Sequence, residues 1–515
     1  MKQSARRGAP RCSSGVSRLA GDAADESEER PQSMRPMDVR IGRSEDRRTG
    51  PWPAQRANLE AVGAALLSAA LYAALAWSEH GLSTHAHRRL ALVTYALTSC
   101  GLFGVYLWVV HAVARWRARF PLVVVLVAPL VFCTGWWLSP PMLSIDVYSY
   151  LADGYLWRHG MNPYFHGVRE LRDTAEGAAL AASGWRPVHG ISPYGPLWTL
   201  IEVAIGRARI SVQAAVLVLK AVVVLAGALA AIAIYAACPD AARVTRLRAA
   251  LLFAWNPTII TEFAGEGHND ALMVLCVIVG LCWIVRRRTV AGAVALAAGV
   301  LAKYLPLLFT FPVLVYLWRT RQSRARFWRG IAAAVIVSVA LATLLYAPFW
   351  AGPDTLNGVR VASHRAFGPG TSGMLAWGLP WVLPVHTASV LGAMGAAVVI
   401  AVVIAASLGV HDAETLSGAC ATIALAYVLI AVPRFWPWYV ALPTALLALT
   451  PTRRSILMIL ALTFCSKLIA PLDLLRVSEA VSWTTEAVVM TMVGVWVPLL
   501  VWVKMSFRAH ASAPQ

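Results

Sequence analysis

Apolar runs of roughly 20 residues recur between residues 58 and 503, and this repetition constrains the fold more than any other feature of the chain. A helix rises about 1.5 Å per residue, so each run is long enough to cross the hydrocarbon core of a bilayer. Only 14% of the residues are charged, whereas soluble domains have about 25%. The pattern predicts an all-α polytopic membrane domain over residues 57–510, with about 13–15 transmembrane helices.

The formal net charge of +19 is divided among short basic clusters that separate the apolar runs. Cytoplasmic loops of membrane proteins are enriched in Lys and Arg, so topology explains these clusters without a nucleic-acid partner. We therefore expect no nucleic-acid binding, and we expect the clusters to be cytoplasmic. They lie at residues 115–119, 286–288, 319–329 and 453–454.

Residues 1–56 differ from the rest of the chain because they are rich in Arg, Ser, Pro and Glu and contain no apolar run. This composition predicts a disordered, basic cytoplasmic tail. The tail lacks the hydrophobic stretch of a cleavable signal peptide, so the first apolar run is expected to direct membrane insertion. The eight cysteines include no CxxC motif and predict small packing residues rather than disulfides or metal ligands.

With the tail inside, the third apolar run leads outward, and residues 139–192 form a large extracytoplasmic loop. One conflict remains in this topology. Basic residues near 207 and at 243–248 both have cytoplasmic character, yet a full span between them forbids that. Either residues 193–209 or residues 249–264 therefore enter the membrane only part-way, beside protein or a wet cavity.

The stretch LSIDVYSY places Asp146 just beyond the outer end of the third run. A carboxylate there can act as a general base if it reaches the hydroxyl that it deprotonates. It can equally cap the helix expected over residues 147–157, which we place at the membrane interface. The residues alone leave both roles open.

A second polar motif, WNPTIITEFAGEGHNDALM, occupies residues 255–273 and leads directly into an apolar helix. Asn269 or Asp270 can cap that helix. Glu266, His268 and Asp270 together have the donor types of a divalent metal site, although their spacing is a weak signal.

Isolated cations mark two further motifs. Lys303 stands between two apolar half-segments and Arg434 lies among aromatic residues, and both positions suit a phosphate. The aromatic residues around Arg434, including Trp438, are either an interfacial belt or a platform for a sugar. Lys220, inside another apolar run, either snorkels to the cytoplasmic face or points into a cavity.

Five motifs, in this order, resemble the polyprenyl-phosphomannose-dependent α-1,6-mannosyltransferases, which are membrane enzymes of the GT-C class. The resemblance covers roughly residues 120–450 and leaves out the tail. The motifs are DVYSYLADGYLWRHGMNPY, SPYGPLW, NPTIITEFAGEGHNDALM, GVLAKYLPLL and FWPWYVALP.

The resemblance implies a GT-C fold and an extracytoplasmic active site that takes a hexose, mannose above all, from a polyprenyl-phosphate donor to a glycan or glycolipid acceptor. Asp146 matches the catalytic carboxylate and would act as general base in an inverting displacement. The residues expected to bind the substrates are Lys303, Arg434, His268, Tyr194, Asn162, Tyr164, Glu266, Asn269, Asp270 and Trp438. No second acidic residue lies within two positions of Asp146, so a DxD metal site is absent and no cofactor is expected, with a divalent metal the weaker alternative.

Two other functions compete with this one. A transporter or flippase of lipid-linked saccharides would also be basic and polytopic, but such proteins place their functional charges near the membrane midplane. A polymerase or ligase of surface glycans would share the outer-face chemistry and differ in the length of its donor.

Overall fold

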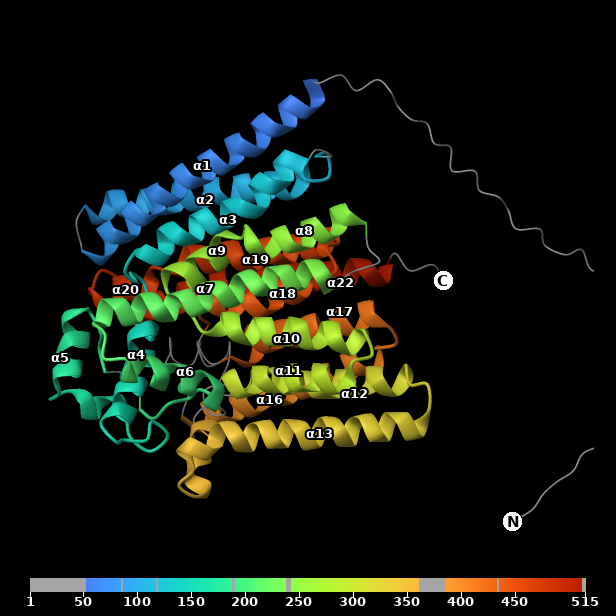
Figure 1. Ribbon diagram of the computed structural model, residues 1–515. Helices are drawn as coiled ribbons and strands as arrows, with labels where there is room; N and C mark the ends of the chain where they lie inside the picture. The colour runs from blue at the N-terminus through green and yellow to red at the C-terminus, as the bar shows by residue number, and fades with distance from the viewer. Residues whose placement is uncertain are drawn as a thin grey trace, which may run out of the picture. The chain divides into compact units, whose positions relative to one another are not determined.

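The computed structural model describes residues 52–84, 87–116, 119–187, 190–237, 242–360, 385–432 and 435–511, all within one compact unit, Pro51–Gln515. These residues form helices and no strand (Figure 1). The first helices are α1 (Trp52–Ser83), α2 (Arg88–Ala112), α3 (Arg119–Leu138), α4 (Asp146–Arg158), α5 (Ala175–Ala182), α6 (Pro196–Arg207), α7 (Val212–Ala237), α8 (Arg243–Ala254), α9 (Pro257–Ile260), α10 (Asp270–Val285) and α11 (Thr289–Ala302). They are followed by α12 (Thr310–Arg319), α13 (Arg324–Tyr346), α16 (Val385–Leu408), α17 (Ala413–Ala426), α18 (Ala441–Ala448), α19 (Arg453–Ile469), α20 (Leu472–Val477), α21 (Trp483–Val489) and α22 (Val497–Ala511).

Short 3₁₀-helical and π-helical segments adjoin several of these helices. The 3₁₀ segments are η1 (Val168–Leu171), η3 (Leu305–Phe309), η4 (Ala347–Phe349), η5 (Pro353–Leu356) and η7 (Pro437–Val440). The π-helical segments are η2 (Thr261–Gly265), η6 (Tyr427–Ala431) and η8 (Met490–Trp496).

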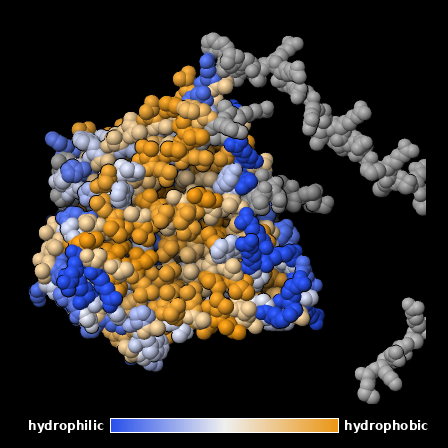
Figure 2. Space-filling view, viewed as in Figure 1, coloured by the Kyte–Doolittle hydropathy of each residue, from blue (hydrophilic) through white to orange (hydrophobic). Residues whose placement is uncertain are grey.

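Six helical stretches of the described chain are long and apolar enough to cross a membrane, and seven shorter apolar helices of 10–17 residues accompany them. Figure 2 shows apolar side chains over the middle of one face, with hydrophilic residues toward its ends. The prediction of an all-α, multi-pass membrane protein is confirmed. The expected number of crossings stays a prediction, because the shorter helices meet the hydropathy of a span without its length.

Several basic clusters meet at one end of the helices, which we call the basic end. Four arginine side chains there donate hydrogen bonds to backbone carbonyls of a neighbouring segment, and these bonds tie together turns that are far apart in sequence. The bonds run from Arg286 to Ala236, from Arg287 to Thr320, from Arg319 to Val410 and from Arg248 to Val110.

The short helices α4, α5 and α6 lie together beyond the opposite end of the helices (Figure 1). Helix α10 connects the two ends: it begins at Asp270 and ends at Val285, beside the basic cluster 286–288. Its 16 residues span roughly 24 Å, most of the thickness of a hydrocarbon core.

Helix α6 packs along α4. Gly154 and Gly206 face each other so closely that a Cβ on Gly154 would lie 2.2 Å from the carbonyl oxygen of Glu202. The guanidinium of Arg207 lies 5.9 Å from the ring centre of Trp157 on α4. The basic residues near 207 are therefore at the same end as α4, which favours residues 193–209 as the segment that enters the membrane only part-way.

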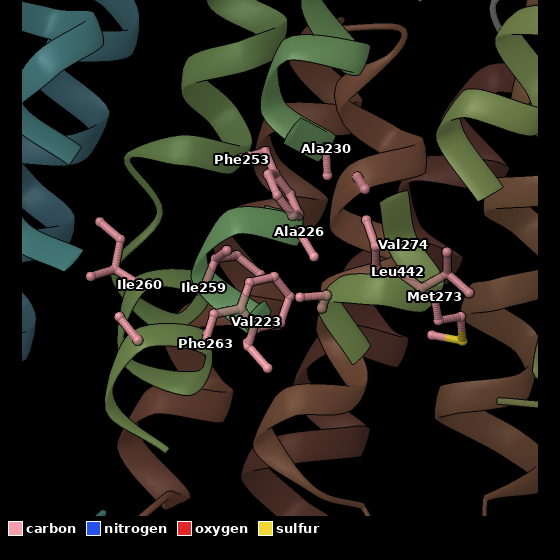
Figure 3. Packing of buried hydrophobic residues seen from close by; sticks show 14 of the residues in the cluster. Val223, Ala226, Ala230, Phe253, Ile259, Ile260, Phe263, Met273, Val274 and Leu442 are labelled. Carbon is pink, nitrogen blue, oxygen red and sulfur yellow. The ribbon is translucent and has the colours of Figure 1, made fainter. Parts of the chain in front are cut away.

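Residues 243–265 return from the basic end to the α4 end as a broken helix. The break falls at Asn256, whose side-chain oxygen accepts the backbone N–H groups of Thr258 and Ile259. Its amide nitrogen donates to Thr463 Oγ1 at 3.0 Å. Beyond the break, Phe263 packs in the apolar cluster that α7, α8, α10 and α18 share (Figure 3). This packing brings the polar residues after Thr261 to the end where α4 begins.

Candidate active site

Asp146 is the first residue of α4 and follows the segment that joins α3 to α4. Ile145 occupies the capping position and makes no side-chain cap, so the Asp146 carboxylate is not the N-cap that the sequence left open. Its backbone N–H donates to Ser144 Oγ at 3.2 Å. The side chain remains 15% exposed, and its Oδ2 lies 3.7 Å from Nδ1 of His268. A carboxylate in a first turn is also favoured by the helix dipole.

His268 is fully buried between two acidic side chains. Its Nδ1 faces Asp146, and its Nε2 lies 3.2 Å from Oε2 of Glu262 on η2. Neither ring nitrogen has the geometry of a hydrogen bond in this arrangement. Burial lowers the pKa of His268 to about 4, although Asp146 and Asp270 act in the opposite direction. The imidazole is therefore neutral at physiological pH, with one donor and one acceptor nitrogen.

A stack of aromatic rings holds the imidazole in place. The ring centres of His268 and Trp438 are 3.7 Å apart with an interplanar angle of 20°, and Trp438 stacks on Trp436 at 5.1 Å. Trp438 is predominantly buried in this stack, whereas Trp436 is half-buried. A sugar face would therefore meet Trp436 more readily than Trp438, the ring that the sequence singled out.

Asp270 and Lys303 form an ion pair beside His268. Asp270 begins α10 and Lys303 follows the last residue of α11, so the ends of two helices meet there. The Lys303 ammonium lies 2.8 Å from Oδ2 of Asp270 and 5.3 Å from the ring centre of Tyr439. Lys303 keeps 23% of its side chain exposed, whereas Asp270 is buried. One ammonium donor is used by Asp270, and the group retains donors for a phosphate.

Glu266 supports the segment before Asp146. Its carboxylate accepts the backbone N–H groups of Met142, Leu143 and Ser144, at 3.3, 3.2 and 2.8 Å. Burial, reinforced by Glu79, raises the pKa of Glu266 to about 8. Through these contacts Glu266 holds the segment before Asp146 in place, and its predicted contact with a sugar stays a prediction.

Lys220 also supports this segment. Its ammonium donates to the carbonyl oxygens of Trp136 and Ser139, at the end of α3. A cation is well placed at the C-terminus of a helix, where unpaired carbonyls gather. Lys220 therefore does not snorkel to the basic end, which is one of the two positions that the sequence left open.

Asn162, Tyr164 and Tyr194 brace the outer loop. Asn162 donates to the carbonyl of Phe349 and accepts the backbone N–H of Tyr164. The Tyr164 hydroxyl donates to the carbonyl of Tyr194 at 3.1 Å, and the Tyr194 ring packs edge-on against Tyr150 at 5.3 Å. The sugar-binding roles predicted for these three residues stay predictions.

Asn269 has the features of a ligand-binding side chain. It is 2% exposed, and neither its amide nitrogen nor its amide oxygen has a hydrogen-bond partner. A buried amide without partners is costly, so a bound hydroxyl or phosphate oxygen is a fitting partner for it. Arg434, another predicted phosphate ligand, lies outside the described residues.

The donors proposed for a metal do not converge. Within the described ranges, no group of three or more His, Cys, Asp or Glu side chains is arranged to hold a metal ion. Glu266 binds backbone amides, Asp270 pairs with Lys303, and His268 lies between Asp146 and Glu262. The three side chains of the metal alternative therefore have separate partners.

Three buried charged residues of this region were not selected from the sequence. One is Glu262, against His268. The others are Lys467 and Glu79, whose ammonium and carboxylate lie 2.8 Å apart, with Thr261 Oγ1 3.0 Å from the ammonium. Each interrupts an apolar run, and a charge within such a run was the signal that could have identified them.

Comparison with known proteins gives a consistent result. Residues 57–321, more than half of the chain, match the family model described as alpha-(1→6)-mannopyranosyltransferase, N-terminal domain. The chain is 26% identical over 365 residues to alpha-(1→6)-mannopyranosyltransferase A of Mycobacterium tuberculosis, covering 64% of this chain and 66% of the relative. It is 31% identical over 184 residues to the protein of the same name from Corynebacterium glutamicum, covering 35% of this chain and 34% of the relative.

A second alpha-(1→6)-mannopyranosyltransferase of M. tuberculosis is 34% identical over 154 residues, which cover 29% of this chain and 25% of that protein. The chain thus matches at most 66% of the length of these relatives.

Proposed function

Because the chain belongs to the alpha-(1→6)-mannopyranosyltransferase family, we propose that it is a membrane mannosyltransferase with a polyprenyl-phosphate sugar as donor and a glycan or glycolipid as acceptor. The names of the relatives state the transfer of a mannopyranosyl group to form an alpha-(1→6) bond. The observation that carries the proposal is the meeting of three motifs at one partly exposed site, which contains Asp146, His268, Asp270 and Lys303.

The proposed reaction is a single displacement at C1 of the mannosyl group. Asp146 takes the proton of the acceptor hydroxyl while the acceptor oxygen bonds to C1. The bond from C1 to the phosphate oxygen breaks, its electron pair leaves with the polyprenyl phosphate, and the configuration at C1 inverts. Negative charge grows on the departing phosphate, and in this proposal the ammonium of Lys303 stabilises it; the support is its partial exposure beside Asp270.

We place the site on the extracytoplasmic face. The support is the separation of the site from the basic end by the length of α10, together with the cytoplasmic preference of Lys and Arg. The N-terminal tail then lies in the cytoplasm. The dispersal of Glu266, His268 and Asp270 among separate partners supports a reaction in which this chain's own side chains supply the base and the cation.

A transporter or flippase is not favoured. The site residues that were predicted from the sequence gather where helices begin or end, as Asp146, Asp270 and Lys303 do. A transport pathway would place such charges near the membrane midplane.

The test is transfer by purified protein in proteoliposomes supplied with labelled polyprenyl-phosphate mannose, glucose or arabinose and with membrane glycolipid extract. Labelled product from the mannose donor alone is expected. Asp146→Asn should reduce turnover by about 10²–10⁴-fold, the usual contribution of a general base. Asp173→Asn makes the same change at an exposed position of the outer loop and serves as the matched control. An active Asp146→Asn protein would contradict the assignment of Asp146 as the base.

A further inference from the structure

Glu262 and His268 form a buried pair directly behind Asp146. The backbone N–H of His268 donates to the carbonyl of Glu262 at 3.1 Å, and their side chains approach to 3.2 Å. Glycine at 267 adopts φ 75°, a conformation that L side chains rarely take, and this turn directs the imidazole back toward Glu262. The stack on Trp438 then restricts rotation of the ring.

A neutral imidazole at this position can donate to only one of its two acidic neighbours. The contact with Glu262 is the shorter, at 3.2 Å, and the contact with Asp146, at 3.7 Å, lies beyond hydrogen-bond distance. Neither contact has hydrogen-bond geometry as it stands, and it is the shorter distance that favours Nε2, beside Glu262, as the protonated nitrogen. The lone pair of Nδ1 then faces an ionised Asp146. Both groups are hydrogen-bond acceptors, so they do not attract each other.

We propose that Glu262 and His268 are positioning residues for Asp146. Glu262 keeps the imidazole proton of His268 on Nε2, and Nδ1 of His268 then accepts a hydrogen bond from Asp146 once Asp146 is protonated. The inference rests on the proposed role of Asp146 as the base. No co-reactant is needed, because the proton that Asp146 carries is the one from the acceptor hydroxyl. Closing the gap to Nδ1 takes a movement of about 1 Å, and the new bond stabilises the protonated base as transfer proceeds.

Other charges around the pair come from several elements. Asp270 on α10 and Lys303 after α11 act on His268. The groups that act on Glu262 are Lys467 on α19, Glu79 on α1, Asp146 on α4, Asp270 on α10 and Glu266. Cations and carboxylates thus surround both Glu262 and His268. A variant that tests the pair must therefore change one side chain and keep a ring stacked on Trp438.

Glu262→Met tests the proposal because it keeps the length of the side chain and removes the acceptor for Nε2. The imidazole proton can then move to Nδ1 and donate to ionised Asp146, which makes Asp146 a weaker base. We expect kcat to fall by about 10–100-fold, the acidic limb of the pH–kcat profile to move to lower pH, and the KM for the donor to stay within about threefold. Glu262→Gln, which retains an acceptor oxygen, should recover part of kcat. Glu170→Met changes an exposed carboxylate of the outer loop and should leave both parameters unchanged.

His268→Phe is the second variant, since it retains a ring against Trp438 and removes both nitrogens. It should lower kcat to a similar extent in protein that keeps its thermal stability. Wild-type kcat and an unshifted acidic limb in either folded variant would overturn the proposal.

A readout without turnover separates this inference from the proposed function. Nitrogen-15 NMR of histidine-labelled protein, with the signals of His268 identified by their loss in His268→Phe, should show the proton on Nε2. In Glu262→Met it should appear on Nδ1. A proton on Nδ1 in the unaltered protein would overturn the inference even if mannose is transferred. Absence of transfer with the proton on Nε2 would instead reject the proposed function and leave the tautomer assignment standing.

Discussion

Among the residues that the structure describes, Lys303 is the cation that is partly exposed and also contacts the site residues. Replacing it with glutamine removes the charge that we assign to the leaving phosphate. We expect kcat/KM for the lipid-linked donor to fall by about 10²–10³-fold, the range measured when a single stabilising group is removed. The measurement is a donor titration in proteoliposomes. Lys504→Gln, an exposed lysine on α22, provides the same substitution away from the site.

Loss of Lys303 also leaves the buried Asp270 without its partner, so stability must be separated from chemistry. The double variant Lys303→Gln/Asp270→Asn removes both charges of the pair. If Lys303 stabilises the phosphate, the double variant regains thermal stability but not activity. Recovery of activity in the double variant would show that Lys303 matters only as the counter-ion of Asp270.

Residue types and motifs selected the residues of the candidate site but did not predict the contacts among them. Asp146, His268, Asp270 and Lys303 were all selected from the sequence, because a charge beside an apolar run is unusual enough to be noticed. The sequence could not show that Glu262 faces His268, since that contact depends on the π-helical turn at η2 and on the left-handed glycine after it. The sequence also could not show the contacts of Glu266, since its partners are backbone amides, which leave no trace in residue identity; its role in sugar binding stays a prediction.

Helix α4 carries Asp146 at its first position, and its contact with α6 fixes where that position lies. Gly154→Ala would place a methyl 2.2 Å from the carbonyl oxygen of Glu202, so α4 must move away from α6. We expect a loss of about 1–3 kcal/mol in the free energy of unfolding, as for an overpacked core, and a fall in kcat. Gly104→Ala on α2 is the control, since a Cβ there meets no atom within 4 Å. Thermal unfolding in detergent and turnover are measured for both, and an unaffected Gly154→Ala protein would contradict the packing argument.

Hydropathy predicted the long apolar helices, and the two segments whose course it left open share a cause. Residues 193–209 have the composition of a short span, and residues 249–264 have that of another, so composition alone could not rank them. Close packing of Gly154 on Gly206 decides that α6 stays beside α4. Side-chain capping by Asn256 decides that the helix after α8 breaks and continues. Both features depend on contacts between particular residues, and hydropathy does not predict such contacts.

At the scale of the whole molecule, the pair Glu79–Lys467 joins the first helix to a helix near the end of the chain. The two groups are fully buried, 2.8 Å apart. Lys467→Met leaves the carboxylate of Glu79 unpaired, and breaking a buried pair in this way costs roughly 3–5 kcal/mol. Glu79→Gln/Lys467→Met removes both charges and should regain most of that stability. Denaturant unfolding in micelles compares the two, and equal destabilisation of both variants would show that packing around Lys467, rather than charge, holds α1 in place.

The arrangement of the ends predicts a definite orientation in the membrane. The arginine-linked turns gather at the basic end, and α10 runs from there to the site. If Lys and Arg mark the cytoplasm, exposed residues around α5 face outward and exposed residues between α12 and α13 face inward. Single cysteines at Ala181 and Gln322, both exposed, report on the two ends when the native cysteines are replaced. A membrane-impermeant maleimide should label Ala181→Cys in intact cells and Gln322→Cys only after permeabilisation. The opposite pattern would place Asp146 on the cytoplasmic side and would contradict the proposed extracytoplasmic active site. The contacts among Asp146, His268 and Glu262 would be unaffected by that result.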